Sequence, residues 1–355
     1  MKVVQVITSA DWGGAQRHLL DLSRGLIARG HTVEVLYGVP GPLVEKLAQA
    51  NISAERVATL TRNLDPLRDL GGLGELRRAI QRLRPDLVHV HSSKAGALVR
   101  AALGGGPIPV VYTVHGLVWR NPRLPWFKRA FYRAVEERLL AGAKVTLVLS
   151  EGDRQALLAA RPDLADRVVQ IANGIDAPVG PHPLPSQLVV GTVARFTPEK
   201  ALDRLVEAVA AVRIRLPDVR LLLVGDGPLR AEVERWVKAQ DLAEITRMVG
   251  FQSEVWPWLL QMRLFVLPSV KEGMPYALLE AMAAQRLILA TPVGAVPEVL
   301  RDYPRGRVVE PGDLAQACYE LLTAEPPPPP TLHLTSIDEM VEAVLAAYRR
   351  AWAES

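Results

Sequence analysis

Residues 264–280 read Leu264-Phe265-Val266-Leu267-Pro268-Ser269-Val270-Lys271-Glu272-Gly273-Met274-Pro275-Tyr276-Ala277-Leu278-Leu279-Glu280. The four apolar residues at the start are too few for a helix, and their run before a turn predicts a buried strand. Pro275 suits the first turn of a helix, where its missing N–H is not needed. The stretch therefore predicts a strand, a polar loop and a helix, the unit from which parallel α/β sheets are built.

The same unit recurs along the whole chain. Apolar runs predict strands at 3–8, 32–36, 87–91, 110–114, 145–149, 168–171, 189–193, 220–224, 246–249, 264–267 and 287–290. Helical spacing of apolar residues predicts helices at 15–29, 42–50, 72–83, 95–103, 126–140, 152–160, 201–216, 228–239, 255–262, 275–284, 314–323 and 337–352. Strands that alternate with helices predict parallel sheets with right-handed crossovers.

A proline-rich segment divides this alternation into two halves. Residues 177–187 contain Pro178, Pro181, Pro183 and Pro185, which neither a helix nor a central strand accommodates. We therefore expect an α/β chain of two doubly wound, Rossmann-like domains, 1–176 and 188–335, that face each other across a cleft and are joined by a linker at 177–187. Ligands of open parallel sheets bind beyond the carboxyl ends of the strands, so the residues that follow each strand are the candidates for function.

The composition favours a globular protein without disulfides or membrane-spanning segments. The 355 residues are 49% hydrophobic and 23% charged, a globular balance with enough chain for two cores. The single Cys318 excludes an internal disulfide framework, and its helical surroundings indicate a buried apolar role. The first residues lack the apolar core and cleavage site of a signal peptide, and no apolar run reaches membrane-spanning length. We expect a cytoplasmic protein.

The charge is unevenly distributed. Residues 1–180 contain 24 Lys and Arg against 16 Asp and Glu, whereas residues 181–355 contain 18 against 22. A basic N-terminal half is typical of a protein with an anionic partner, and it is equally compatible with an Arg-rich genome. Nucleic acid is one such partner, but no nucleic-acid-binding module is recognisable in the sequence, and we expect none.

Charged residues follow two predicted strands in the C-terminal half. Arg195 and Lys200 come after strand 189–193, where both could bind one diphosphate. Glu272 lies in the loop after strand 264–267, and Glu280 lies on the following helix. Carboxylates accept hydrogen bonds from paired hydroxyl groups, so these acids suit a sugar and a ribose.

The N-terminal half offers glycines and histidines at strand ends. Gly13 and Gly14 precede a helix whose free N–H groups suit a phosphate, although the dinucleotide-binding pattern GxGxxG is absent. His115 follows strand 110–114 and could exchange protons near neutral pH. His89 and His91 share one face of their strand, but no carboxylate accompanies them at metal-ligand spacing, so we expect no metal site.

Residues 119–133 combine five basic and five aromatic side chains without an acid. Such a mixture suits the interface of an anionic membrane. The alternative is a helix whose aromatic face packs under its own domain, which we favour for Phe131 and Tyr132.

Seven stretches match one known family in order: Gly13–Gln16, Pro85–Gly96, Thr113–Gly116, Asn173–Asp176, Gly191–Lys200, Val224–Pro228 and Glu272–Glu280. The sequence resembles the retaining, GT-B-fold glycosyltransferases of family four, also called group 1, over essentially the whole chain. Glu272 and Glu280 are the acids of the family's E-x7-E motif. The sequence departs from the family at Gln16, where Glu is common, and at Ala201 and Ala295, where Gly is usual.

The resemblance implies roles for individual residues. It places His115, Glu272, Arg195 and Lys200 at the reacting centre. It implies donor contacts for Gly14, Arg195, Lys200, Gly225, Phe251, Gln252, Glu272, Gly273, Met274, Pro275 and Glu280. It implies an acceptor side in the N-terminal domain with Gly13, His91, Lys94 and Asn173, onto which the C-terminal helix 337–355 packs back.

The resemblance also implies a reaction. A nucleotide-diphosphate sugar, most commonly a UDP-sugar, would give its sugar to a glycan, lipid-linked or small-molecule acceptor with retention at the anomeric carbon and without a metal or other cofactor. The stretch from Ser92 to Gly96 is similar to that of members that build bacterial surface polysaccharide or glycolipid, which would place the protein at the inner face of the cell membrane. Alternatives are a sugar-nucleotide epimerase, a phosphorylase, or a non-catalytic protein that binds sugar or nucleotide.

Overall fold

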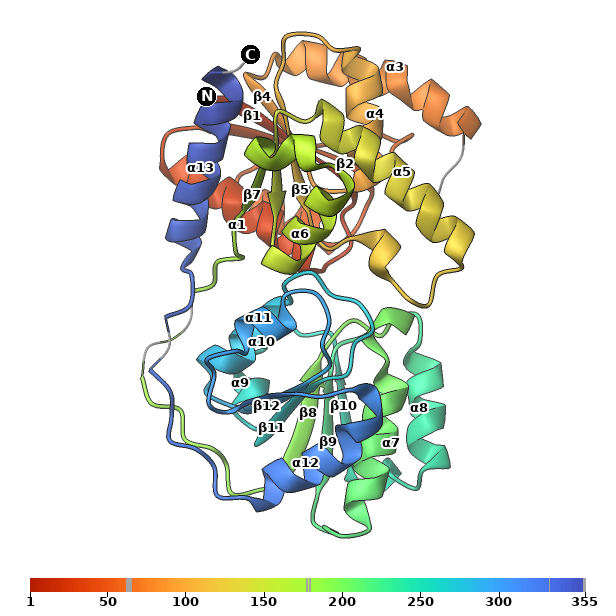
Figure 1. The fold of residues 1–355 in the computed structure, drawn as a ribbon, viewed down its shortest axis with the longest axis vertical. Coiled ribbons are helices and arrows are strands. Elements are labelled where there is room, and N and C mark those ends of the chain that lie inside the picture. The colour runs from red at the N-terminus through yellow and green to blue at the C-terminus, as the bar shows by residue number, and fades with distance from the viewer. Residues whose placement is uncertain (62–65, 177, 179, 332, 354–355) are drawn as a thin grey trace. The chain divides into compact units, whose positions relative to one another are not determined.

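The computed structural model describes residues 1–61, 66–176, 178, 180–331 and 333–353. For residues 66–70 it describes the backbone alone. Contacts divide the chain into two compact units (Figure 1). Unit 1 comprises Met1–Gly174 and Thr335–Ser355, and unit 2 comprises Ile175–Leu334. Positions 177, 179, 354 and 355, which belong to the expected linker and C-terminal helix, lie outside the described residues.

Unit 1 is built on a seven-stranded parallel sheet in the order β3-β2-β1-β4-β5-β6-β7. Its strands are β1 (Lys2–Ser9), β2 (Thr32–Val39), β3 (Ser53–Arg56), β4 (Leu87–Val90), β5 (Val110–Val114), β6 (Val145–Val148) and β7 (Val168–Gln170). Its helices are α1 (Gly14–Ala28), α2 (Pro42–Gln49), α3 (Pro66–Leu83), α4 (Ser93–Leu103), α5 (Trp126–Gly142), α6 (Glu151–Ala160) and α13 (Ile337–Ala353), with 3-10 turns η1 (Val118–Arg120) and η2 (Pro162–Arg167).

Two hydrophobic layers cover the faces of this sheet. Because successive strand residues point to opposite faces, Val3 and Ile7 of β1 pack with α1, α2 and α13, whereas Val4 and Val6 pack with α3, α4, α5 and α6. Strands buried on both faces need continuous apolar sequence, which is why the central strands are so evident in the sequence. The expected α/β class with doubly wound parallel sheets is confirmed.

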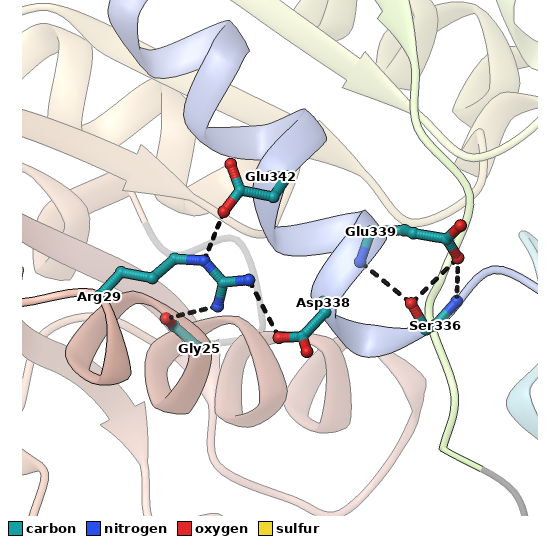
Figure 2. A network of polar contacts seen from close by, with 6 residues as sticks. All are labelled: Gly25, Arg29, Ser336, Asp338, Glu339 and Glu342. Atoms are coloured by element: carbon teal, nitrogen blue, oxygen red, sulfur yellow. Dashed lines mark hydrogen bonds and ion pairs between the residues drawn. The ribbon is translucent and has the colours of Figure 1, made fainter.

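The last helix, α13, lies against α1 (Figure 1). Arg29, which follows α1, donates hydrogen bonds to Glu342 at 2.6 Å and Asp338 at 3.0 Å (Figure 2). Ser336 and Glu339 cap the start of the helix reciprocally: the Ser336 N–H donates to the Glu339 carboxylate at 2.8 Å, and the Glu339 N–H donates to Ser336 Oγ at 3.1 Å. Helix α13 also contributes Val344 and Tyr348, both fully buried, to the core of unit 1.

Unit 2 has a six-stranded parallel sheet in the order β10-β9-β8-β11-β12-β13. Its strands are β8 (Val189–Val193), β9 (Arg220–Val224), β10 (Thr246–Gly250), β11 (Leu264–Leu267), β12 (Leu287–Ala290) and β13 (Gly306–Val308). Its helices are α7 (Leu202–Arg213), α8 (Arg230–Ala239), α9 (Trp256–Leu259), α10 (Tyr276–Ala283), α11 (Val296–Val299) and α12 (Leu314–Thr323), with 3-10 turns η3 (Pro198–Lys200), η4 (Ala243–Ile245) and η5 (Pro311–Asp313).

Two arginines tie the proline-rich segment to unit 2. Arg286 is fully buried and donates to the carbonyl oxygens of His182 at 2.6 Å and Pro183 at 3.0 Å. Arg263 donates to the carbonyl oxygen of Pro185 at 3.0 Å. The described part of this segment is therefore held on one unit by several hydrogen bonds.

The strand orders place the candidate sites. In each sheet the winding direction reverses next to the first strand, between β1 and β4 in unit 1 and between β8 and β11 in unit 2. Such a switch point leaves a crevice at the carboxyl ends of the two strands, where ligands of this architecture bind. Gly13, Gly14, Arg195, Lys200 and Glu272 follow strands of these two pairs, whereas His115 follows the next strand, β5.

Candidate active site

The centre of the site in unit 2 is an ion pair between Lys200 and Glu272. Lys200 Nζ lies 2.6 Å from Glu272 Oε1 and 2.8 Å from Oε2, so one ammonium group bridges both carboxylate oxygens. The two side chains are 21% and 7% exposed. Ser269 Oγ donates a further hydrogen bond to Glu272 Oε1 at 2.6 Å. The carboxylate is thereby held in one orientation, at the carboxyl end of β11.

Backbone contacts fix the loop that carries Glu272. The Val270 N–H donates to the carbonyl oxygen of Glu199 at 2.9 Å, which joins this loop to the turn that carries Lys200. Thr291 Oγ1 donates to the Ser269 carbonyl at 2.6 Å, and the Ala295 N–H donates to the Gly273 carbonyl at 2.8 Å. Residues 269–273 are thus anchored by the segments that follow the two neighbouring strands, β8 and β12.

Ala201, directly after Lys200, adopts the left-handed conformation with φ 46° and ψ 49°. A side chain in this region costs about 1 kcal/mol or more, a cost that glycine avoids. A glycine, which the resemblance leads us to expect at this position, would avoid that cost. The structure tolerates alanine here, and the ion pair of Lys200 forms next to it.

The other predicted donor residues occupy the same edge of the sheet. Arg195 follows β8 and is half-buried, and Gly225 follows β9 with φ 134°. A Cβ at Gly225 would lie 1.9 Å from the Ala194 carbonyl oxygen, so only glycine fits between these strand ends. Met274 and Pro275 are buried at the start of α10, and Glu280 is half-buried on that helix.

Phe251 and Gln252 lie at the same carboxyl edge of the sheet, farther from the Lys200–Glu272 ion pair in the strand order. They follow β10, which is separated from β8 by β9 in the sheet order. The Phe251 ring is 48% exposed, whereas the Gln252 amide donates to the Val249 carbonyl at 3.0 Å. The described part of unit 2 therefore arranges a charged centre, a helix with a carboxylate and an exposed aromatic ring along one sheet edge.

Unit 1 gathers four histidines beside its own switch point. His91 Nδ1 lies 3.2 Å from His115 Nε2, and the tilted His89 and His91 rings have centroids 4.1 Å apart. His18 of α1 meets His115 edge to face with centroids 5.1 Å apart. His18 Nδ1 bonds Asn173 Oδ1 at 3.0 Å, so the predicted residues His91, His115 and Asn173 belong to one cluster.

Burial keeps these histidines neutral. It lowers the pKa of His18 to about 4, although the hydrogen bond to Asn173 acts in the opposite direction. Burial, together with neighbouring histidines, also lowers the pKa of His91 and of His115 well below the usual value. Neutral rings in contact with one another serve as specific hydrogen-bond donors and acceptors rather than as charges.

The remaining predicted residues of unit 1 lie around this cluster. Gly13 is the N-terminal cap of α1 and Gly14 is the exposed first residue of that helix. Lys94 on α4 donates to Thr61 Oγ1 at 3.3 Å. Sequence reasoning missed His18, whose signal is its place four residues after Gly14, on the same face of α1.

The histidines do not form a metal site. Both ring nitrogens of His89 are engaged, Nδ1 with the Tyr348 hydroxyl at 2.6 Å and Nε2 with Thr113 Oγ1 at 2.7 Å. Among the residues that the structure describes, no group of three or more His, Cys, Asp or Glu side chains is placed to hold a metal ion. Nor is any helix of the described chain long and apolar enough to cross a membrane.

Segment 119–133 exposes three of its five aromatic side chains, whereas Trp119 is half-buried against the core of unit 1. Trp126 is 79%, Phe127 54% and Phe131 48% exposed. The expectation that Phe131 packs under its own domain is wrong, because α5 uses its C-terminal half, with Leu139 and Leu140, for packing. Tyr132 is half-buried and contacts the Phe131 ring.

Comparison with known proteins identifies the chain. Residues 12–178 match the model of Glycosyltransferase Family 4, and residues 187–324 match that of Glycosyl transferases group 1. The alpha-maltose-1-phosphate synthase of Mycolicibacterium smegmatis is 31% identical over 271 residues, which cover 67% of this chain and 68% of that protein. The UDP-Gal:alpha-D-GlcNAc-diphosphoundecaprenol alpha-1,3-galactosyltransferase of Escherichia coli is 27% identical over 303 residues, covering 80% and 77%.

The fold has close structural counterparts. HepE of Anabaena, solved in complex with UDP-glucose, superposes with a TM-score of 0.75 at 20% identity, covering 100% of this chain and 98% of that one. TarM of S. aureus, solved with UDP, fondaparinux and alpha-GlcNAc-glycerol, superposes with a TM-score of 0.78 at 12% identity, covering 99% of both chains. The fold is GT-B, and the chain is a glycosyltransferase that belongs to the group 1 glycosyltransferases of family 4.

Proposed function

We propose that the chain is a retaining hexosyltransferase that takes its sugar from a UDP-sugar bound to unit 2. The observation that carries this proposal is the Lys200–Glu272 ion pair at the switch point, followed by α10 with Glu280. An ammonium group neutralises a diphosphate, and a carboxylate fixed beside it accepts hydrogen bonds from sugar hydroxyls. HepE, with the same fold, was solved with UDP-glucose, which supports a uridine nucleotide.

Individual residues then take the following roles. Arg195 and Lys200 bind the diphosphate, and Glu272 with the backbone of Gly273, Met274 and Pro275 holds the sugar. Glu280 accepts hydrogen bonds from the ribose hydroxyls, and Phe251 and Gln252 lie beside the base. Gly225, which has no side chain, lets the backbone come close to the donor. In unit 1 we assign Gly14 and His115 to the donor, and Gly13, His91, Lys94 and Asn173 to the acceptor side.

The reaction follows from the charges. The bond between the anomeric carbon and the phosphate oxygen breaks, and positive charge develops on the sugar while negative charge grows on the diphosphate. Arg195 and Lys200 stabilise that negative charge, which is where preorganised groups accelerate reactions most. The acceptor oxygen attacks the face that the phosphate leaves, and its proton passes to the departing phosphate oxygen. An inverted anomeric configuration in the product would contradict this scheme.

Nucleotide binding tests the donor site. We expect calorimetric titration to show UDP binding more tightly than GDP or ADP, and Glu280→Ala to weaken UDP binding about 10²-fold, because two hydrogen bonds to a carboxylate are lost. Glu244→Ala, which removes an exposed carboxylate in η4, is the matched control and should leave the affinity unchanged. Equal UDP affinity of wild type and Glu280→Ala would refute the assignment of Glu280.

We propose a lipid-linked acceptor at an anionic membrane, in bacterial surface polysaccharide or glycolipid synthesis. The relative from Escherichia coli is named for a diphosphoundecaprenol acceptor, a lipid-linked sugar. In this chain Trp126 and Phe127 stand exposed beside the exposed Lys128 and Arg129 at the start of α5. Aromatic rings enter the interface while cations meet anionic head groups, which would hold the enzyme peripherally on the inner face of the membrane.

Flotation with liposomes tests this surface. We expect the wild type to float with anionic liposomes and much less with neutral ones, and Trp126→Ala combined with Arg129→Glu to reduce binding more than about tenfold, since each charge near the surface contributes about 1 kcal/mol. Trp352→Ala is the control, because this tryptophan on α13 is also 59% exposed. Unchanged flotation of the double variant would exclude α5 as the membrane contact.

A further inference from the structure

The histidine cluster of unit 1 ends in a chain of buried hydrogen bonds. Gln5 of β1 lies between Ser23 of α1 and His91: Gln5 Nε2 is 2.7 Å from Ser23 Oγ, and Gln5 Oε1 is 2.8 Å from His91 Nε2. Gln5 and Ser23 are fully buried, and His91 is 2% exposed. Since these groups have no access to water, their protons are assigned by their partners within the chain.

The protons can be placed one bond at a time. Ser23 Oγ lies 2.6 Å from the Leu19 carbonyl oxygen, which only accepts, so the serine proton points there. Ser23 Oγ must then accept from Gln5, which orients the NH2 group of the amide towards Ser23 and its oxygen towards His91. An amide oxygen only accepts, so His91 carries its proton on Nε2.

The same logic reaches His115. A neutral histidine carries one ring proton, so His91 with Nε2–H presents a lone pair on Nδ1. His115 Nε2, 3.2 Å away, must supply the proton of that contact. Burial lowers the pKa of His91 and of His115 well below the usual value, which keeps both rings neutral.

We propose that Ser23, Gln5 and His91 form a positioning relay that holds neutral His115 with its proton on Nε2, so that its Nδ1 offers a lone pair to a substrate hydroxyl. His115 therefore accepts a hydrogen bond from the sugar or the acceptor and does not donate one. The identity of that hydroxyl rests on the proposed function, whereas the position of the proton does not. The edge-to-face contact with His18, whose Nδ1 is held by Asn173, keeps the His115 ring in place.

Nitrogen NMR on the full-length protein, labelled with 15N in its seven histidines, measures this directly. The His115 signals are identified by their loss in His115→Gln. We expect wild-type His115 to show a protonated Nε2 and an unprotonated Nδ1. A proton on Nδ1 would overturn the proposal, whether or not the enzyme is active and whichever donor it uses.

Gln5→Met tests the relay itself, because methionine fills a similar volume without the amide. We expect at least half of His115 to carry its proton on Nδ1 in this variant. The value of kcat should then fall about twofold or more, in proportion to the lost Nε2–H form. The affinity for UDP, which lacks the sugar, should not change. Tyr348→Phe is the control: it removes the hydrogen bond to His89 in the same buried layer and should leave the His115 tautomer unchanged.

An unchanged tautomer in Gln5→Met would refute the relay. If this variant does not fold, Ser23→Ala provides the same test, because loss of the serine acceptor frees the Gln5 amide to turn over. We expect a mixture of His115 tautomers in that variant as well, and a single Nε2–H tautomer there would equally refute the relay.

Discussion

Replacing Lys200 with alanine should lower kcat/KM about 10²- to 10³-fold, the effect of removing one preorganised group that stabilises developing negative charge. The structure gives a second reason why the loss of Lys200 should lower kcat/KM. Lys200 bridges both oxygens of Glu272, whose side chain is 7% exposed and is otherwise bonded by Ser269. Without Lys200 this carboxylate loses its cation and lies nearly buried, close to the place we assign to the diphosphate. Donor binding then loses an attraction and gains a repulsion.

A second variant separates these two effects. In Lys200→Met combined with Glu272→Gln, the negative charge is removed together with the ammonium group, so we expect UDP to bind more tightly than to Lys200→Ala. Turnover should stay low, because nothing replaces the cation or the sugar contact. Lys238→Ala, at an exposed position of α8, is the control and should behave as wild type. A value of kcat/KM for Lys200→Ala within about threefold of wild type would contradict the role of Lys200, since that is well below the loss of one such group.

The fold was predictable because central parallel strands are continuous apolar runs. The predicted bounds of five strands, β5, β8, β9, β11 and β12, agree with the structure residue for residue. The sequence analysis missed β3 and β13, which lie at sheet edges. Their sequences, Ser-Ala-Glu-Arg and Gly-Arg-Val, contain no apolar run, because an edge strand is paired on one side and needs less burial.

The site was predictable in part, for a related reason. Residues that follow strands can be found by position, and these include Arg195, Glu272 and His115. Contacts between distant residues leave no local pattern: Lys200 and Glu272 are 72 positions apart, and His18 and Asn173 are 155 apart. The neutral state of the histidines likewise depends on burial among distant elements, such as α1 at His18 and α13 at Tyr348, which no short motif encodes.

Gly294 should be as sensitive to substitution as the charged residues, although it has no side chain to contact a substrate. It follows β12 and has φ +55°, a conformation that costs other residues strain. A Cβ at this position would lie 2.4 Å from the Gly273 carbonyl oxygen and 2.5 Å from that of Glu272. Both atoms are backbone, so no side chain can rotate away to make room. The loop that holds Glu272 must therefore move.

We expect Gly294→Ala to lower kcat/KM about 10²-fold, because relief of the overlap requires a shift of about 1 Å, and displacements of that size in a positioned group have such effects. The strain of about 1–3 kcal/mol should leave the protein folded by circular dichroism. Gly312→Ala is the matched control, since a Cβ there would meet nothing within 4 Å. If folded Gly294→Ala kept the wild-type kcat/KM, the position of the 272–273 backbone would not limit the reaction, and the assignment of this loop to the transferred sugar would fail with it.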